Sequence, residues 1–148
     1  MSNNSGSTDN NLRVLVAEDH PANQRLVLAI LKPHGYEVTL VETGQEVLDQ
    51  WRENEFDLIL MDMQMPVMDG LDATIEIRAR EIASGRPRTP IAMLTAHAME
   101  DHLTQTMAAG ADHHITKPVS PSNLIAGMEE TLVRAMGNGS GSAKATSS

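Results

Sequence analysis

The stretch between residues 56 and 70 constrains the fold of this chain more than any other. An apolar run at residues 58–61 meets a single carboxylate, Asp62, and the chain then breaks into a loop at Pro66 and Gly70. A short apolar run bounded by turn residues is typical of a strand buried on both faces of a parallel sheet. A carboxylate at the end of such a strand is costly to bury unless its charge is compensated. Asp62 therefore requires a cationic side chain or a metal ion nearby.

Similar apolar runs alternate with helical patterns along the chain. We predict strands at residues 12–17, 36–41, 58–62, 90–94 and 113–116. Helices are expected to begin at Pro21, after Thr43 with its capping-box partner Glu46, after Asp69, at Met99 and after Ser120. This alternation predicts an α/β fold, with a parallel sheet covered by helices on both faces and connected by right-handed crossovers.

The helical patterns also predict which side chains face the core. The expected residues, helix by helix, are Leu26, Leu28, Ile30 and Leu31; Val47, Leu48 and Trp51; Leu71, Ile75 and Ile77; and Leu124, Ile125, Met128 and Leu132.

Composition excludes several functional classes. The formal net charge of −9 argues against nucleic-acid binding through a basic face. The absence of cysteine excludes disulfides, thiolate metal sites and a cysteine nucleophile. No apolar run is long enough to span a membrane, and no signal-peptide pattern opens the chain. We therefore expect a cytoplasmic protein, or a piece of a larger one, with no membrane contact of its own.

The 148 residues suit one domain. Residues 1–11 are small and polar and are expected to be disordered. Residues 137–148 resemble a flexible linker, so the folded domain is predicted at residues 12–136.

Polar residues follow most of the predicted strands. Glu18 and Asp19 follow the first strand, Asp62 the third, Thr95 the fourth and Lys117 the fifth. Because sites in parallel sheets form beyond the carboxyl ends of the strands, these side chains are expected to meet in one crevice. Three carboxylates there would repel one another, and a hard divalent cation, Mg²⁺ or Mn²⁺, resolves that conflict.

A divalent cation, an ammonium group, a hydroxyl and a carboxylate together indicate phosphoryl transfer to the carboxylate. An aspartate can attack phosphorus and form an acyl phosphate. The cation and Lys117 would offset the charge on the equatorial oxygens, and little else is required of the protein.

With these residues in place, the sequence between Leu12 and Met136 resembles a receiver domain of two-component signalling. The resemblance implies the flavodoxin-like (βα)5 fold with strand order 2-1-3-4-5. It also implies a role for each site residue. Asp62 is the expected phosphoacceptor. Glu18, Asp19, Asp62 and the main-chain carbonyl of Gln64 are the expected metal ligands; Thr95 and Lys117 are expected to close on the phosphoryl group, and Pro118 to follow a peptide bond that is often cis.

Further motifs are similar to receivers of hybrid histidine kinases. These are MDMQMPVMDG at residues 61–70, Asn23-Gln24-Arg25, Ala73-Thr74, and PIAMLTAHAM at residues 90–99. The resemblance implies a histidine kinase or a histidine phosphotransfer domain as partner in a phosphorelay, and a weak homodimer. It implies a switch domain that promotes its own phosphorylation and dephosphorylation and is not a conventional turnover enzyme.

Two histidines depart from the usual family pattern. His114 occupies the position three residues before Lys117, where receivers usually have Tyr or Phe, so the usual threonine–aromatic readout is expected to differ. His97, two residues beyond Thr95, is expected at the mouth of the site. Together with Gln64 it could tune the access of water to the phosphoaspartate.

Alternative functions stay open at this stage. One is a stand-alone response regulator that acts by protein–protein interaction. Another is a degenerate receiver that binds partners without phosphorylation, but the intact set of Glu18, Asp19, Asp62, Thr95 and Lys117 argues against it. An Asp-nucleophile phosphatase is disfavoured because Gln64 stands where such enzymes need a second aspartate. A transition-metal site among His97, His102, His113 and His114 is also disfavoured, because none of their spacings places a pair on one helix face.

Overall fold

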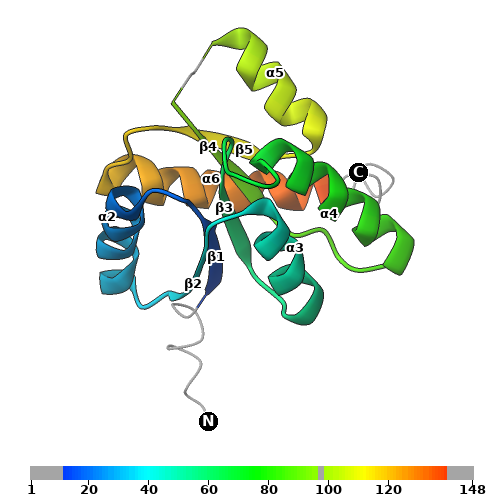
Figure 1. Cartoon of the computed structure of the whole chain (residues 1–148), viewed down its shortest axis with the longest axis horizontal. Coiled ribbons are helices and arrows are strands. Elements are labelled where there is room, and N and C mark those ends of the chain that lie inside the picture. Colours follow the sequence, from blue (N-terminus) through cyan, green and yellow to red (C-terminus); the bar gives the residue numbers. More distant parts are fainter. Residues whose placement is uncertain (1–11, 97–98, 140–148) are drawn as a thin grey trace.

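A computed structural model of the chain describes residues 12–96 and 99–139. Five parallel strands form one sheet in the order β2-β1-β3-β4-β5, as predicted (Figure 1). The strands are β1 (Arg13–Ala17), β2 (Glu37–Val41), β3 (Leu58–Asp62), β4 (Ile91–Thr95) and β5 (His113–Thr116). The helices are α2 (Pro21–Leu31), the short 3₁₀ helix η1 (Lys32–His34), α3 (Gly44–Glu53), α4 (Gly70–Ser84), α5 (Glu100–Ala109) and α6 (Pro121–Gly139).

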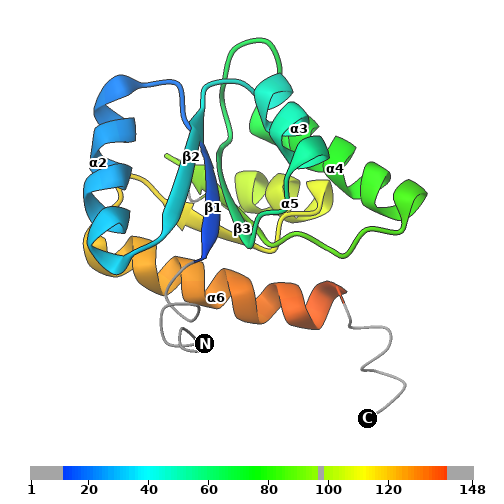
Figure 2. The same cartoon turned by 90° about the horizontal axis from the view of Figure 1, so that it is seen from below.

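Helices cover both faces of the sheet because the strands alternate apolar side chains between two cores. On β1, Leu15 packs in the core beneath α3 and α4, whereas Val14 and Val16 pack in the core beneath α2 and α6. Figure 2 shows α2 and α6 on one side of the strands and α3 and α4 on the other. Every residue of β3 is buried, which confirms the expectation for a central parallel strand.

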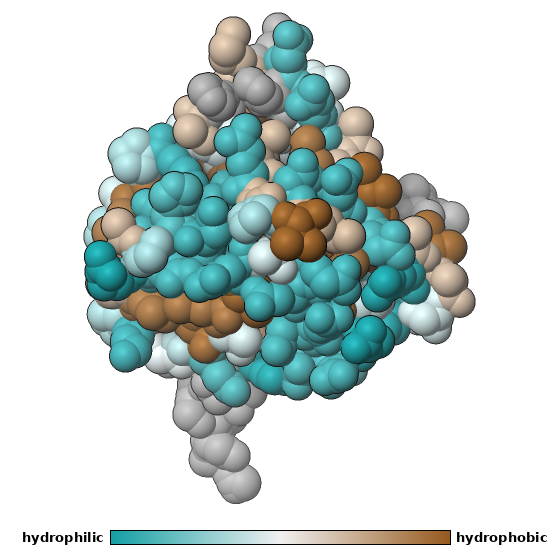
Figure 3. Space-filling view, in the orientation of Figure 1, coloured by the Kyte–Doolittle hydropathy of each residue, from teal (hydrophilic) through white to brown (hydrophobic). Residues whose placement is uncertain are grey.

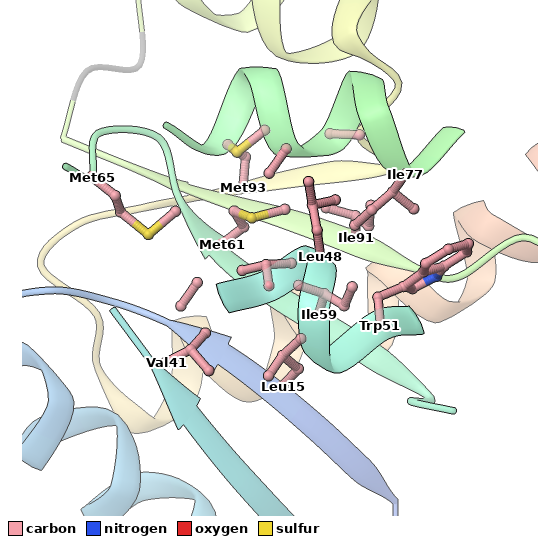
Figure 4. Packing of buried hydrophobic residues seen from close by; sticks show 14 of the residues in the cluster. Leu15, Val41, Leu48, Trp51, Ile59, Met61, Met65, Ile77, Ile91 and Met93 are labelled. Atoms are coloured by element: carbon pink, nitrogen blue, oxygen red, sulfur yellow. The ribbon is translucent and has the colours of Figure 1, made fainter. Parts of the chain in front are cut away.

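The core beneath α3 and α4 includes a polar contact at Trp51. Figure 4 shows Trp51 at the end of this cluster, with Leu48, Ile59 and Ile77 further inside. The Trp51 indole nitrogen donates a hydrogen bond of 3.1 Å to the Thr89 hydroxyl, so the polar edge of the ring is satisfied where it is buried.

Two predicted core positions are wrong. Leu26 is 38% exposed and Ile75 is 53% exposed. On α2 the buried stripe is Val27, Ile30 and Leu31, with the i, i+3, i+4 spacing of one helix face, and Leu26 lies about 100° around the helix from Val27. On α4, Ile75 is two residues from the buried Ile77, which is about 200° around the helix, so Ile75 lies on the far side.

The predicted helix starts agree with the observed caps. Thr43 and Glu46 form a complete capping box at α3, and the Asp69 side chain accepts a hydrogen bond from the Asp72 backbone N–H at the start of α4. Gly110 closes α5 with φ of 109°, a left-handed conformation that favours glycine.

The last helix extends further than predicted. α6 ends at Gly139, three residues beyond the expected boundary at Met136. Residues 1–11 and 140–148, for which we predict disorder, lie outside the described residues. Within the described part of the chain, no helix is long and apolar enough to cross a membrane. Figure 3 shows a mainly hydrophilic surface in this view, with a few separate hydrophobic patches.

The loop between β3 and α4 packs against two glycines. A Cβ atom at Gly70 would collide with the backbone carbonyl oxygen of Asp62, and one at Gly44 with the carbonyl oxygen of Met68. The Gly70 N–H also donates a hydrogen bond of 2.9 Å to the Met63 carbonyl. The backbone around Asp62 is therefore positioned by a close approach that only glycine permits.

We predict that Gly70→Ala lowers the free energy of unfolding by about 1–3 kcal/mol, because the methyl group meets backbone that cannot move aside. Gly137→Ala is the matched control, since Gly137 lies in α6 with open space around its Cα. The control should be neutral or stabilising by up to about 1 kcal/mol. Urea denaturation of both variants tests this, and equal stability of the two would contradict it.

Candidate functional site

The carboxyl ends of β1, β3, β4 and β5 meet around one open crevice of about 440 Å³. Asp19, Asp62, Thr95 and Lys117 line it, each delivered by a different strand end. Glu18 lies beside them and is fully buried. The structure therefore brings together the five residues predicted from strand ends.

Lys117 provides a cationic partner for Asp62. Its ammonium nitrogen donates a hydrogen bond of 3.1 Å to Asp62 Oδ2 and lies 3.2 Å from Glu18 Oε1. Burial lowers the pKa of Lys117, but the hydrogen bond and charge of Asp62, followed by the charge of Glu18, outweigh this, so that the net pKa is raised. Lys117 is therefore firmly protonated and is shared between two carboxylates.

The carboxyl group of Asp62 is under-compensated. Burial, followed by the negative charge of Glu18, raises its pKa; the Lys117 contact and the backbone N–H of Gln64, 3.3 Å from Asp62 Oδ1, only partly oppose the rise. One ammonium group cannot neutralise both buried carboxylates and the neighbouring Asp19. The site retains negative charge.

Glu18 shows this imbalance most directly. Its Oε2 accepts a hydrogen bond of 3.1 Å from the backbone N–H of His20. Its Oε1 is buried and lies 3.2 Å from the Lys117 ammonium as an ion pair, but it accepts no hydrogen bond from any residue that the structure describes. A buried carboxylate oxygen without a donor fits a divalent cation, and Mg²⁺ prefers such oxygen ligands. Glu18, Asp19, Asp62 and the Gln64 carbonyl are the residues that would hold it.

His20 is a site residue that the sequence analysis missed. Its Nδ1 lies 3.1 Å from Asp19 Oδ1 and 3.6 Å from Glu18 Oε2, and its side chain is 70% exposed at the mouth of the crevice. Among the described residues, Glu18, Asp19 and His20 form the one group of three side chains close enough to share a metal ion. The position of His20 directly after Glu18 and Asp19 was the sequence feature that could have identified it.

The remaining predicted residues occupy different places. Thr95 ends β4 and is buried, and its carbonyl accepts a hydrogen bond of 2.7 Å from the Lys117 backbone N–H. The Lys117–Pro118 peptide bond is cis. His114 lies on β5 opposite Met93 and lines a groove against α6; burial, followed by the positive charge of Arg134, lowers its pKa. His97 lies outside the described residues.

A doubly wound five-stranded sheet with an acidic crevice and an ion-paired lysine at its carboxyl edge defines a recognisable class of α/β domain. The chain belongs to the response regulator receiver domain family, whose model matches residues 14–129. This assignment confirms the predicted family and flavodoxin-like fold, and it removes the phosphatase alternative.

Similar proteins include a sensor protein and a hybrid histidine kinase. The chain is 44% identical over 112 residues to the sensor protein GacS of Pseudomonas syringae, and 39% identical over 117 residues to hybrid signal transduction histidine kinase I of Dictyostelium discoideum. Each match covers 76% of this chain but only 12% and 7% of the relatives. The chain therefore corresponds to a small part of these kinases, in agreement with the predicted hybrid-kinase likeness.

Similar solved structures agree with the fold. The receiver domain of the sensor histidine kinase PA1611 of Pseudomonas aeruginosa, solved with magnesium in its active-site cleft, has a TM-score of 0.74 and 35% identity, covering 83% of this chain and 98% of that one. The receiver domain of Ssk1 from Saccharomyces cerevisiae, solved with the phosphotransfer protein Ypd1, has a TM-score of 0.75 and 30% identity, covering 80% and 86%. CheY4 of Vibrio cholerae has a TM-score of 0.75 and 29% identity, covering 82% and 98%.

We predict that Asp62→Asn raises the free energy of unfolding by about 1 kcal/mol at pH 7 without divalent cations, because it removes an under-compensated buried charge. The pKa of Asp62 is raised in the folded protein, so its ionised form costs stability above that pKa and the penalty disappears below its ordinary pKa of 3.8. The gain should therefore vanish as the pH falls toward 3.8.

Denaturant unfolding at several pH values measures this gain. Asp69→Asn is the control, because it replaces a carboxylate outside the crevice by asparagine, which also caps a helix. A gain for Asp62→Asn that persists unchanged at low pH would rule out the electrostatic explanation.

Proposed function

We propose that this receiver domain accepts a phosphoryl group on Asp62 from a phosphohistidine, with Mg²⁺ or Mn²⁺ bound, and changes its partner-binding surface or passes the phosphate on. The observation that carries the proposal is the crevice itself: a nearly buried Asp62 paired with Lys117, beside a buried Glu18 oxygen that lacks a donor. Members of this family typically bind Mg²⁺, and the PA1611 receiver was solved with that ion.

The transfer exchanges one bond to phosphorus for another. An Asp62 carboxylate oxygen attacks phosphorus, the bond between phosphorus and the donor imidazole nitrogen breaks, and an acyl phosphate forms. A divalent cation supplies charge stabilisation for the transferring oxygens. Lys117 is already placed to move from Asp62 to a phosphoryl oxygen, and the Thr95 hydroxyl is proposed to follow the new charge.

The proposed readout is a population shift between two surface states. A phosphoryl group adds negative charge that draws Thr95 and Lys117 inward, and Lys117 is bonded through its backbone to the Thr95 carbonyl. The face formed by α5, β5 and α6 is the proposed switch surface. His114 on β5 is proposed to replace the usual aromatic residue in this movement.

Treatment with acetyl phosphate and Mg²⁺ should add the mass of one phosphoryl group to the parent chain. Asp62→Asn should gain none, because it removes the nucleophile, whereas Asp69→Asn should be modified like the parent. Intact-protein mass spectrometry at short times gives the measurement. If Asp62→Asn is phosphorylated to the same extent as the parent, the phosphoacceptor assignment is wrong.

Two outputs remain to be distinguished. Hybrid-kinase relatives and the Ypd1 complex of Ssk1 favour a phosphorelay with a histidine phosphotransfer partner. The alternative output is that of a stand-alone response regulator that acts by protein–protein interaction.

For the relay, we expect labelled phosphate on Asp62 to move to the histidine of a phosphotransfer domain at least about tenfold faster than water removes it. The reason is that a docked imidazole acts at a high effective concentration. Mixing the labelled chain with candidate phosphotransfer domains and following label on both proteins tests this. A phosphotransfer domain whose acceptor histidine is replaced by glutamine is the control, and label lost only to water would favour the stand-alone regulator.

A further inference from the structure

Gln24 joins the first turns of α2 to the backbone of the acidic pair. Its side-chain amide nitrogen donates a hydrogen bond of 2.6 Å to the main-chain carbonyl of Glu18, six residues earlier. We propose that Gln24 is a positioning residue for the cation site: it holds the backbone that presents Glu18 and Asp19, and so sets how tightly Mg²⁺ binds. The inference rests on the cation site of the proposed function. It assigns a role to a residue outside the lining of the crevice.

The start of α2 lacks the side-chain cap that commonly ties a helix to the chain before it. His20 occupies the N-cap position, and its side chain makes no capping hydrogen bond. Pro21 follows as the first helical residue, and the first turn contains no acidic side chain. Gln24, the fourth residue of the helix, instead reaches back past His20 to Glu18. This bond therefore ties the helix to the acidic pair where a cap is missing.

Glu18 is held at three points by different parts of the molecule. Its N–H donates a hydrogen bond of 3.0 Å to the Val41 carbonyl on β2, and its Oε2 accepts one of 3.1 Å from the His20 N–H. Its carbonyl oxygen accepts the bond from Gln24. Because Glu18 is fully buried, a carbonyl that lost this donor would bear the cost of an unsatisfied polar group or turn toward another partner.

A turn of that carbonyl would displace a predicted metal ligand. The Glu18 carbonyl and the Asp19 N–H belong to one planar peptide unit, so rotation of the carbonyl also moves the backbone of Asp19. Mg²⁺ demands near-ideal octahedral geometry from its ligands, so a displaced carboxylate binds it less well. An uncharged donor suits this position, because a cationic side chain there would compete with the ion for the charge of the acidic pair.

Titration calorimetry of the whole chain with Mg²⁺ tests the inference. Gln24→Met keeps the approximate size of the side chain but cannot donate, and we expect it to lower Mg²⁺ affinity about tenfold, as loss of a contact that supports metal ligands usually does. Gln24→Asn is the second variant, polar but one methylene too short to reach, and it should lose affinity similarly. Gln45→Met is the matched control. It removes an exposed amide that bonds Asp49 on α3, and should leave the affinity within about twofold.

The Mg²⁺ dependence of phosphorylation by acetyl phosphate separates positioning from general destabilisation. In Gln24→Met the Mg²⁺ concentration that gives half the maximal rate should rise about tenfold, while the rate at saturating Mg²⁺ stays within about twofold of the parent's, because Asp62 and Lys117 are unchanged. A purely structural role would lower stability and leave the Mg²⁺ affinity of the folded variants at the parent's value.

Three results would overturn the proposal: the parent's Mg²⁺ affinity in either folded Gln24 variant, an equal loss in Gln45→Met, or a parent chain that binds no Mg²⁺. A chain whose Mg²⁺ affinity depends on Gln24 but which is never phosphorylated on Asp62 would contradict the proposed function and leave this inference standing.

Discussion

The interaction on which the site depends is the sharing of one lysine between two buried carboxylates. Lys117 reaches Asp62 at 3.1 Å and Glu18 at 3.2 Å, and its single charge cannot neutralise both. Burial and the negative charge of Glu18 raise the pKa of Asp62, and Lys117 offsets the rise only in part. Among the described residues, Glu18 Oε1 is also left without a hydrogen-bond donor. A cation or a rearrangement of Lys117 relieves this shortage of positive charge, which makes the crevice responsive to ligands in a way that a balanced ion pair is not.

Asp112 shows what a balanced buried carboxylate looks like in the same molecule. It is fully buried, and it accepts hydrogen bonds from Arg78 at 2.8 Å, from Arg88 at 2.9 Å and from the Ile91 backbone N–H at 3.0 Å. These contacts tie α4 and the residues before β4 to the start of β5, at the end of the sheet opposite the crevice. Both ends of the sheet contain buried charge, and among the described residues the charge at the carboxyl end is incompletely paired whereas Asp112 is balanced. The difference separates a structural network from a ligand site.

The sheet and most of the crevice could be predicted from the sequence, because the alternation of strands and helices fixes both the fold and the residues that follow each strand. Parallel strands bring Asp19, Asp62, Thr95 and Lys117 to one edge whatever their separation in sequence. The sequence contains no comparable pattern that shows which side chains will bond to one another. The bond between Arg78 and Asp112 joins residues 34 positions apart, and no local pattern announces it. His20 was missed for the opposite reason, because a single exposed histidine beside two acids has no periodicity. The predicted helix faces were wrong at Leu26, which lies just outside the buried stripe of α2, and at Ile75, which lies on the far side of α4 from the buried Ile77.

The loop after Asp62 is held by tertiary contacts more than by its own preferences. Val67 has φ of 71°, a conformation that is costly for a β-branched residue, and its side chain is 85% exposed. The loop persists because Gly70 N–H bonds the Met63 carbonyl at one end and Gly44 N–H bonds the Met68 carbonyl at the other. Gly44 is the first residue of α3, so the backbone that carries Asp62 is coupled directly to the start of that helix. A movement of Asp62 toward a new ligand therefore acts on α3 as well as on β5. We expect the backbone at Met68 and Gly44 to shift together with Lys117 when Asp62 moves.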